Sequence, residues 1–225
     1  MNTLIISCMD RRLNRIIDGE NIGDAIVLRN AGANASALSL SIRRNIENNN
    51  IGMIKFIPHS DCGAMKVVYG ALKQGAKVSN DIDEALVKQF RNQKFDSREE
   101  LEKLNEKFQE EFLKEFKLKV ETKFVELKSE EEKKEHVAVF TYSSKMKFED
   151  LAKLSNLDID STYFIEADSI EEVYADLEIA AKNLGIKRFL FIATEPSHYR
   201  PMYADMQKFM MKDFAKGLNV ELVKL

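Results

Sequence analysis

Residues 53–63 read MIKFIPHSDCG, and this stretch decides how the rest of the chain is interpreted. Its apolar first part, residues 53–57, is too short for a helix and predicts a buried strand. His59 and Cys62 follow that strand, three positions apart. Imidazole nitrogen and thiolate sulfur both suit a transition metal, and the spacing lets both bind one ion. The stretch therefore predicts a strand whose carboxyl end provides two metal ligands.

The second cysteine, Cys8, also ends an apolar run, at residues 3–7. The carboxyl ends of parallel strands face one crevice, so Cys8 is expected to meet His59 and Cys62 there. Two thiolates and one imidazole leave the fourth position of a tetrahedral zinc site open, as in catalytic zinc centres. The alternatives are a disulfide between the cysteines, or two unrelated buried thiols beside a core histidine.

Outward from these strands, apolar runs alternate with helical patterns. The first third predicts three strands, at residues 3–7, 25–28 and 53–57, each followed by a helix. The alternation resumes near the C-terminus, with predicted strands at residues 136–142, 163–167, 188–193 and 220–223. Such alternation predicts an α/β fold, with a parallel β-sheet core flanked by helices and extra C-terminal βα units.

Residues 80–135 interrupt this pattern with a segment dense in Glu and Lys. Its apolar residues recur every three or four positions, at Leu101, Leu104, Phe108, Phe112, Phe116, Val120, Phe124 and Leu127. This spacing predicts a long charged helical insertion, packed on its own domain or on a partner subunit. We treat residues 1–225 as one domain, and we find no internal sequence repeat.

Composition limits the classes of function. Of the 225 residues 44% are hydrophobic and 32% charged, with a formal net charge of −3. These values argue against general attraction to nucleic acid or to an anionic membrane. The sequence shows no secretory signal and no apolar run long enough to span a bilayer, so we expect a cytoplasmic protein with reduced thiols.

Three motifs stand at predicted strand ends in the order CMDRR at 8–12, RNAG at 29–32 and HSDCG at 59–63. Together they resemble the β-class carbonic anhydrases. The resemblance implies that zinc is held by Cys8, His59 and Cys62, and that Asp10 and Arg12 form a dyad beside it. In some members of that family the aspartate occupies the fourth zinc position and closes the site, and the sequence leaves both states open.

The residues agree with these roles. Asp10 lies two positions after Cys8, which in extended chain places both side chains on one face. It could accept a hydrogen bond from zinc-bound hydroxide, while Arg12 orients the carboxylate through a bidentate pair. The alternative is a surface ion pair. Arg29 and Asn30 are expected to brace the crevice, and Asp61 to support a ligand or to face solvent.

The resemblance also implies a function. It predicts a zinc lyase that reversibly hydrates carbon dioxide to bicarbonate through zinc-bound hydroxide, in a homodimer or higher homo-oligomer. Alternatives are a related zinc hydrolase acting on carbon disulfide or carbonyl sulfide, and a non-catalytic zinc-binding regulatory protein.

Two features depart from the family pattern. The N-terminal helical arm that wraps a dimer partner has no counterpart before residue 3, so the insertion is expected to supply dimer contacts instead. The segment EPSHYR at residues 195–200 matches no family motif. It could contact an anion or relay protons, but a capped loop is the simpler interpretation, because Ser197 can begin a helix and Pro201 suits a first turn.

Overall fold

The computed structural model describes residues 1–21, 23, 25–129 and 135–225. Within these ranges, eight strands form one sheet in the order β4-β3-β1-β2-β6-β5-β7-β8. The strands are β1 (Asn2–Cys8), β2 (Ala25–Asn30), β3 (Ile51–Ile57), β4 (Lys119–Thr122), β5 (Val137–Thr141), β6 (Thr162–Glu166), β7 (Arg188–Ala193) and β8 (Asn219–Lys224). All neighbours are parallel except β2 and β6, which pair antiparallel. The predicted α/β class is confirmed.

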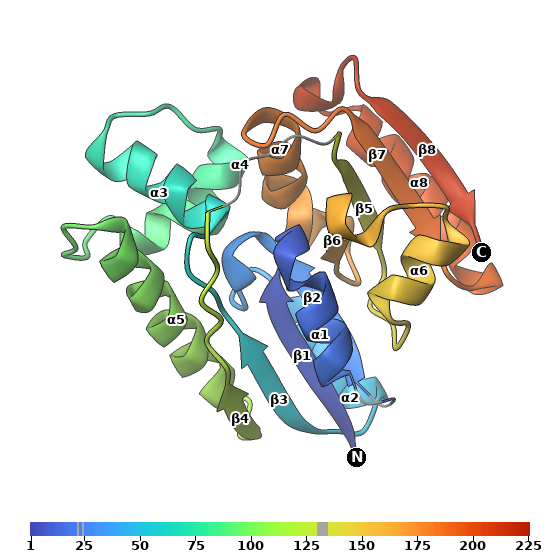
Figure 1. Cartoon of the computed structure of the whole chain (residues 1–225), viewed down its shortest axis with the longest axis horizontal. Coiled ribbons are helices and arrows are strands. Elements are labelled where there is room, and N and C mark those ends of the chain that lie inside the picture. Colours follow the sequence, from blue (N-terminus) through green and yellow to red (C-terminus); the bar gives the residue numbers. More distant parts are fainter. Residues whose placement is uncertain (22, 24, 130–134) are drawn as a thin grey trace.

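Helices cover both faces of the sheet. The α-helices are α1 (Asn14–Glu20), α2 (Ser39–Asn48), α3 (Gly63–Lys73), α4 (Asn80–Ile82), α5 (Arg98–Lys114), α6 (Phe148–Leu154), α7 (Tyr174–Lys182) and α8 (Tyr199–Met210). Short 3-10 turns lie between them at η1 (Arg11–Leu13), η2 (Ala31–Ala33), η4 (Lys88–Phe90), η5 (Ile159–Ser161), η6 (Ile170–Val173), η7 (Pro196–His198) and η8 (Asp213–Ala215), with one π-helical turn, η3 (Asp83–Val87). Figure 1 shows α1 and α6 in front of the sheet and α2 behind it.

The central strands are apolar along their whole length because the sheet is covered on both faces. In β1, the side chains of Leu4, Ile5 and Ile6 are all fully buried, although neighbours on a strand point to opposite faces. This explains why the predicted strands read as continuous apolar runs in the sequence.

The insertion contains the amphipathic helix that its spacing predicts, and this is α5. Leu101 and Leu113 are fully buried, while Phe108 and Phe112 pack against the same core. Figure 1 shows α5 along the β4 edge of the sheet. The apolar stripe therefore packs against the core of its own chain, which is one of the two predicted arrangements, and the dimer contacts stay a prediction.

The prediction of helix is wrong for residues 119–122 of the insertion, which form strand β4, and residues 130–134 lie outside the described ranges. The chain leaves the helical direction at Lys117, whose φ of 57° is left-handed. Val120 and Thr122 are β-branched and favour a strand, and β4 pairs parallel with β3. Its charged residues Lys119 and Glu121 suit an edge strand, where charge discourages pairing with other chains.

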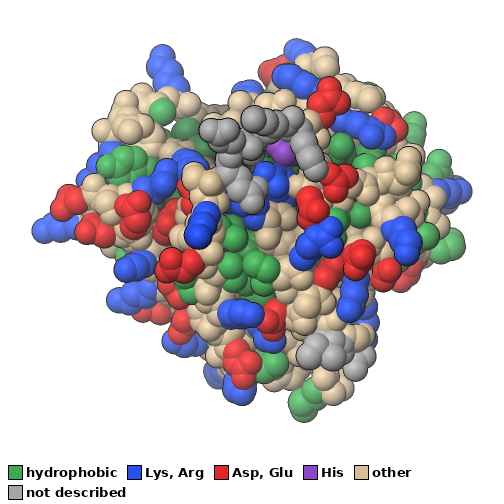
Figure 2. Space-filling model, in the orientation of Figure 1, with side chains coloured by type: hydrophobic (Ala, Val, Ile, Leu, Met, Phe, Trp, Pro, Cys, Tyr) green, Lys and Arg blue, Asp and Glu red, His purple; other side chains and the backbone are tan. Residues whose placement is uncertain are grey.

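The exterior shows no segregation of charge on the visible face. Figure 2 shows basic and acidic side chains intermingled across it, as the small net charge predicts. None of the helices in the described ranges is long and apolar enough to cross a membrane.

We predict that Leu101→Ala lowers the free energy of unfolding by about 2–5 kcal/mol, because it leaves a cavity under α5. Lys107→Ala, on the exposed face of the same helix, should change it by less than about 0.5 kcal/mol. Urea unfolding measures both. Equal effects of the two substitutions would show that the stripe is not packed as described.

Candidate metal centre

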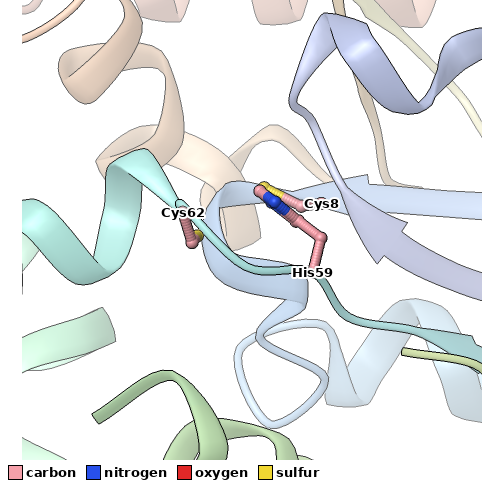
Figure 3. A group of neighbouring side chains, drawn as sticks. All are labelled: Cys8, His59 and Cys62. Carbon is pink, nitrogen blue, oxygen red and sulfur yellow. The ribbon is translucent and has the colours of Figure 1, made fainter. Parts of the chain in front are cut away.

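The three predicted ligands converge at one end of the sheet. Cys8 is the last residue of β1, and β1 pairs with β3, which is followed by His59 and Cys62. Their ligand atoms all lie within 4.8 Å of one another, and all three residues are buried. Figure 3 shows Cys8 at the end of its strand and the other two on the segment that leads into α3. The predicted convergence is confirmed.

The histidine ring is oriented for metal binding. Nδ1 of His59 lies 2.7 Å from the carbonyl oxygen of Ser60, so it is the protonated nitrogen and donates there. Nε2 is buried and has no hydrogen-bond partner among the described residues. A histidine ligand whose other nitrogen donates to a carbonyl is the usual arrangement around zinc. The orphaned Nε2 and two free buried cysteines therefore fit zinc and not a disulfide.

The environment of Cys8 favours its thiolate, which is the form that binds metal. Burial alone would raise the pKa of Cys8, but the hydrogen bond from Cys62, together with the charge that His59 carries when its ring is protonated, outweighs burial and holds that pKa well below its usual value. The backbone N–H of Gly32 also donates to Sγ of Cys8 at 3.3 Å. The site is thus prepared to bind a cation through sulfur.

The loop that includes Gly32 is held from two sides. Gly32 has φ of +75°, and a Cβ there would lie 3.2–3.3 Å from the side chains of Met65 and Ala64, so glycine is required. Its carbonyl accepts a hydrogen bond from Nδ2 of Asn105 at 2.8 Å. The preceding amide, that of Ala31, donates to Oδ1 of Asp176 at 2.8 Å.

Arg29 braces the first motif, as expected. Its guanidinium is fully buried. Nε and Nη2 donate to the carbonyl oxygen of Cys8 at 2.9 and 2.7 Å, and Nη2 donates also to the carbonyl oxygen of Asp10 at 2.8 Å. Nη1 donates to Oδ1 of Asn14. A buried charge requires this many partners.

Asp10 and Arg12 form a bidentate ion pair. Nε of Arg12 lies 2.9 Å from Oδ1 of Asp10, and Nη2 lies 2.6 Å from Oδ2. Both side chains are only 11–13% exposed, so this is not the surface ion pair of the alternative interpretation. Burial acts to raise the pKa of Asp10, but Arg12 outweighs it and lowers that pKa. In this structure the carboxylate therefore faces Arg12 and is not one of the three clustered ligands.

Asp61 supports the dyad and not a metal ligand. Its Oδ2 lies 2.9 Å from Nη1 of Arg12, and its Oδ1 lies 2.8 Å from Nζ of Lys66. Burial tends to raise the pKa of Asp61, but the hydrogen bonds from Lys66 and Arg12 lower it to about 2. Asp61 thus fixes the far side of the guanidinium that orients Asp10.

A pocket of about 320 Å³ opens beside the ligands. Its polar side includes Asp10, Arg11, Arg12, Asp61 and Lys66. Its apolar side includes Met9, Ala31, Tyr163, Ile179 and Leu184. The last three residues belong to the C-terminal half of the chain, so both halves build the pocket.

The insertion also contributes to the site, which its sequence does not predict. Oε1 of Glu102 accepts the backbone N–H of Cys62 at 2.9 Å, and Asn105 binds the Gly32 loop. Both residues are buried on α5. The available signal was the spacing of Glu102, Asn105 and Gln109 by three and four, which places a polar line beside the apolar stripe.

The 195–200 segment lies elsewhere. It follows β7 in the other half of the sheet and contributes nothing to the described wall of the pocket. The predicted cap by Ser197 is absent, since its hydroxyl donates to Glu195 at 3.4 Å and the 3-10 turn η7 begins at Pro196. Pro201 does lie in the first turn of α8.

The comparisons with known proteins agree with this geometry. A sequence model described as "Carbonic anhydrase" matches residues 3–143. The chain belongs to the carbonic anhydrase family, and its three motifs are those of the β class. No curated protein gives a significant match.

Two solved structures resemble the chain in part. A carbonic anhydrase from Glaciozyma antarctica is 25% identical, with a TM-score of 0.37, over 55% of this chain and 75% of its own. A structure described as one of two tetrameric β-carbonic anhydrases from Sordaria macrospora is 19% identical, with a TM-score of 0.41, over 56% of this chain and 75% of its own.

We predict that the wild-type protein binds about one zinc per chain, through three protein ligands. His59→Ala removes a ligand and should lose most of the metal, as measured by elemental analysis after dialysis. His198→Ala removes a histidine outside the cluster and should retain it. Loss of zinc in both variants would contradict the assignment.

We predict a change in acid stability for Asp61→Asn. The pKa of Asp61 is about 2 in the folded protein and about 3.9 in an unfolded chain, so its ionisation stabilises the fold above about pH 4. That contribution is lost as the pH falls toward 2. Asp61→Asn should therefore lower the free energy of unfolding at pH 7 and flatten its fall between about pH 4 and pH 2.

Urea unfolding of the metal-free protein across this pH range measures the effect, since acid also releases bound metal. The matched control is Asp96→Asn, at an exposed position. A fall with pH as steep in Asp61→Asn as in the wild type would contradict the prediction.

Proposed function

We propose that this protein is a zinc-dependent carbonic anhydrase that reversibly hydrates carbon dioxide to bicarbonate. The observation that supports this most is the placement of a Cys2His ligand set beside a pocket that also includes the paired Asp10 and Arg12. Family membership gives independent support. Cys8, His59 and Cys62 would bind the metal.

When bound, zinc lowers the pKa of a water ligand and so supplies a nucleophile near neutral pH. Asp10 would orient that nucleophile. A carboxylate offers about four acceptor positions. Three are taken by the backbone N–H, Nε and Nη2 of Arg12. One position remains on Asp10 to accept a hydrogen bond from a reacting O–H group.

Arg12 would position Asp10 and would not itself react. Its guanidinium is fixed by Asp10 on one side and by Asp61 and the carbonyl oxygen of Lys128 on the other. Because five donors in a planar fork cannot rotate independently, these contacts fix the direction of the Asp10 carboxylate.

The apolar side of the pocket suits the substrate. Carbon dioxide is small, uncharged and has no hydrogen-bond donor, so the side chains of Met9, Ile179 and Leu184 can contact it without leaving a polar group unsatisfied. The polar side, with Arg11 and Lys66, offers hydrogen bonds to the anionic product.

We also propose a cytoplasmic location. Cys8 and Cys62 are buried close together and must stay reduced to bind metal, a state that the cytoplasm maintains.

We predict that Asp10→Asn lowers kcat/KM for carbon dioxide hydration by about 10²–10⁴-fold, with zinc content unchanged. Stopped-flow hydration with a pH indicator measures it. Asp160→Asn changes an aspartate in an exposed ion pair with Arg15 and should leave the rate unchanged.

Full hydration activity in Asp10→Asn would remove its proposed role. Sulfide release from carbon disulfide or carbonyl sulfide, without carbon dioxide hydration, would assign the same site to the alternative hydrolase. Zinc binding without turnover of any of the three would indicate a non-catalytic protein.

A further inference from the structure

The two halves of the sheet have the same topology. From the centre outward, the first half runs β2-β1-β3-β4 and the second runs β6-β5-β7-β8. In each half the strand that comes first in the sequence lies second from the centre, and a helix follows each of the first three strands. Figure 1 shows the halves side by side, with β2 and β6 meeting between them. The sequence contains no repeat that would predict this arrangement.

The junction relates the halves by an approximate two-fold axis. β2 and β6 occupy equivalent positions and pair antiparallel, with Arg29 opposite Glu166. Antiparallel pairing of two equivalent strands is what a two-fold axis produces at an interface between identical subunits. Arg29 therefore corresponds to Glu166, and their parallel neighbours Ser7 and Thr141 correspond to each other.

Side-chain contacts repeat with the topology. The Ser7 hydroxyl donates to the carbonyl oxygen of Ile57 at 2.9 Å, and the Thr141 hydroxyl donates to that of Ile192 at 3.0 Å. In both halves these residues are register partners on adjacent strands. Ile57 therefore corresponds to Ile192.

A second pair of contacts crosses the junction symmetrically. The amide of Ala31, two positions after Arg29, donates to Asp176 on α7 at 2.8 Å. The amide of Asp168, two positions after Glu166, donates to Ser41 on α2 at 2.8 Å. Each half thus binds the loop of the other through the corresponding helix.

The positions that match Cys8 and His59 hold other residue types in the second half. Cys8 corresponds to Tyr142, and His59 corresponds to Thr194, by position after the matched residues. The ring of His198 packs edge-on against Tyr142 at 5.2 Å, and its Nδ1 lies 3.5 Å from the hydroxyl of Thr194. The unexplained 195–200 segment is therefore the counterpart of the HSDCG motif.

The second half also has a counterpart of the pocket. This hollow, of about 300 Å³, is lined by Tyr142, Asp168 and His198 from its own half and by Arg44 and Asn49 from the other. The metal pocket is lined by the first half and by Tyr163, Ile179 and Leu184 from the second. Each half contributes side chains to the lining of the other half's pocket. The side chains that the second half contributes to the metal pocket belong to its apolar side.

We propose that residues 137–224 are a second copy of the metal-binding unit that has lost its ligands and occupies the place of a symmetry partner. One chain then forms one complete metal centre without a second subunit. Within it, Asp176 is a positioning residue. It holds the amide of Ala31, next to the Gly32 amide that donates to Cys8. The proposal depends on the metal centre but not on the identity of the substrate.

The test measures cobalt(II) affinity and the cobalt–thiolate absorption of Asp176 variants. Asp176→Leu removes the acceptor and should weaken cobalt binding about 10- to 100-fold, the usual effect of losing a group that supports metal ligands, with a shifted absorption band. Asp176→Asn keeps an oxygen acceptor and should restore both. Ser41→Ala removes the symmetric contact on the side without ligands, and should change neither.

Equal weakening in Asp176→Leu and Ser41→Ala would show a merely structural interface and would overturn the positioning role, as would unchanged binding in Asp176→Leu.

A mixing experiment tests whether one chain suffices. Excess His59→Ala chains have an intact second half but no complete ligand set. They should not restore cobalt affinity to Asp176→Leu chains, because each centre is completed by its own chain. Restored affinity would show that another chain supplies the wall, and would overturn the proposal. Failure of carbon dioxide hydration alone would leave these metal measurements intact, so the two proposals are tested separately.

Discussion

The buried guanidinium of Arg29 is the contact on which most of this structure depends. Burial lowers its pKa, to about 10, yet it remains protonated at neutral pH. A buried cation is costly unless its donors are satisfied. Arg29 satisfies them with the carbonyl oxygens of Cys8 and Asp10 and with Asn14. It therefore fixes the backbone between the first metal ligand and the dyad, while its own strand forms the junction between the halves.

The rest of the site is built around that contact by successive sets of interactions. The strand ends place the ligands. The backbone N–H of Gly32 donates to the sulfur of Cys8, and the backbone N–H of Cys62 donates to the carboxylate of Glu102 on α5. Charged residues then fix one another in sequence, from Asp61 to Arg12 to Asp10. Since each set of interactions restrains the next, the metal centre depends on the insertion and on the C-terminal half as well as on the family motifs.

The sequence predicted the contacts between residues that lie at the ends of neighbouring strands. In a parallel sheet, a ligand that ends one strand must lie near a ligand that ends its neighbour, so the approach of Cys8 to His59 could be anticipated. Strand β4 could not be anticipated, because the charged residues of this edge strand continue the charged pattern of α5. Nor could the roles of Glu102 and Asn105, since the partners of a buried polar group on a helix depend on tertiary packing.

The duplication is not visible in the sequence, for a chemical reason. Ile57 and Ile192 are identical, but other matching positions share a backbone role and not a side chain, as with Cys8 and Tyr142 or Arg29 and Glu166. Burial raises the pKa of the Glu166 carboxyl well above its usual value, whereas Arg29 stays charged at the corresponding position. A fold can keep its strand order while the chemistry of one half is replaced.

The central claim is that two cysteines and one histidine hold a single zinc with one position open. X-ray absorption at the zinc edge of the loaded protein tests it most directly. The account predicts two sulfur ligands at about 2.3 Å and nitrogen or oxygen ligands at about 2.0–2.1 Å in a four-coordinate site. A zinc coordination shell with fewer than two sulfurs, or with four protein ligands and no open position, would contradict this claim.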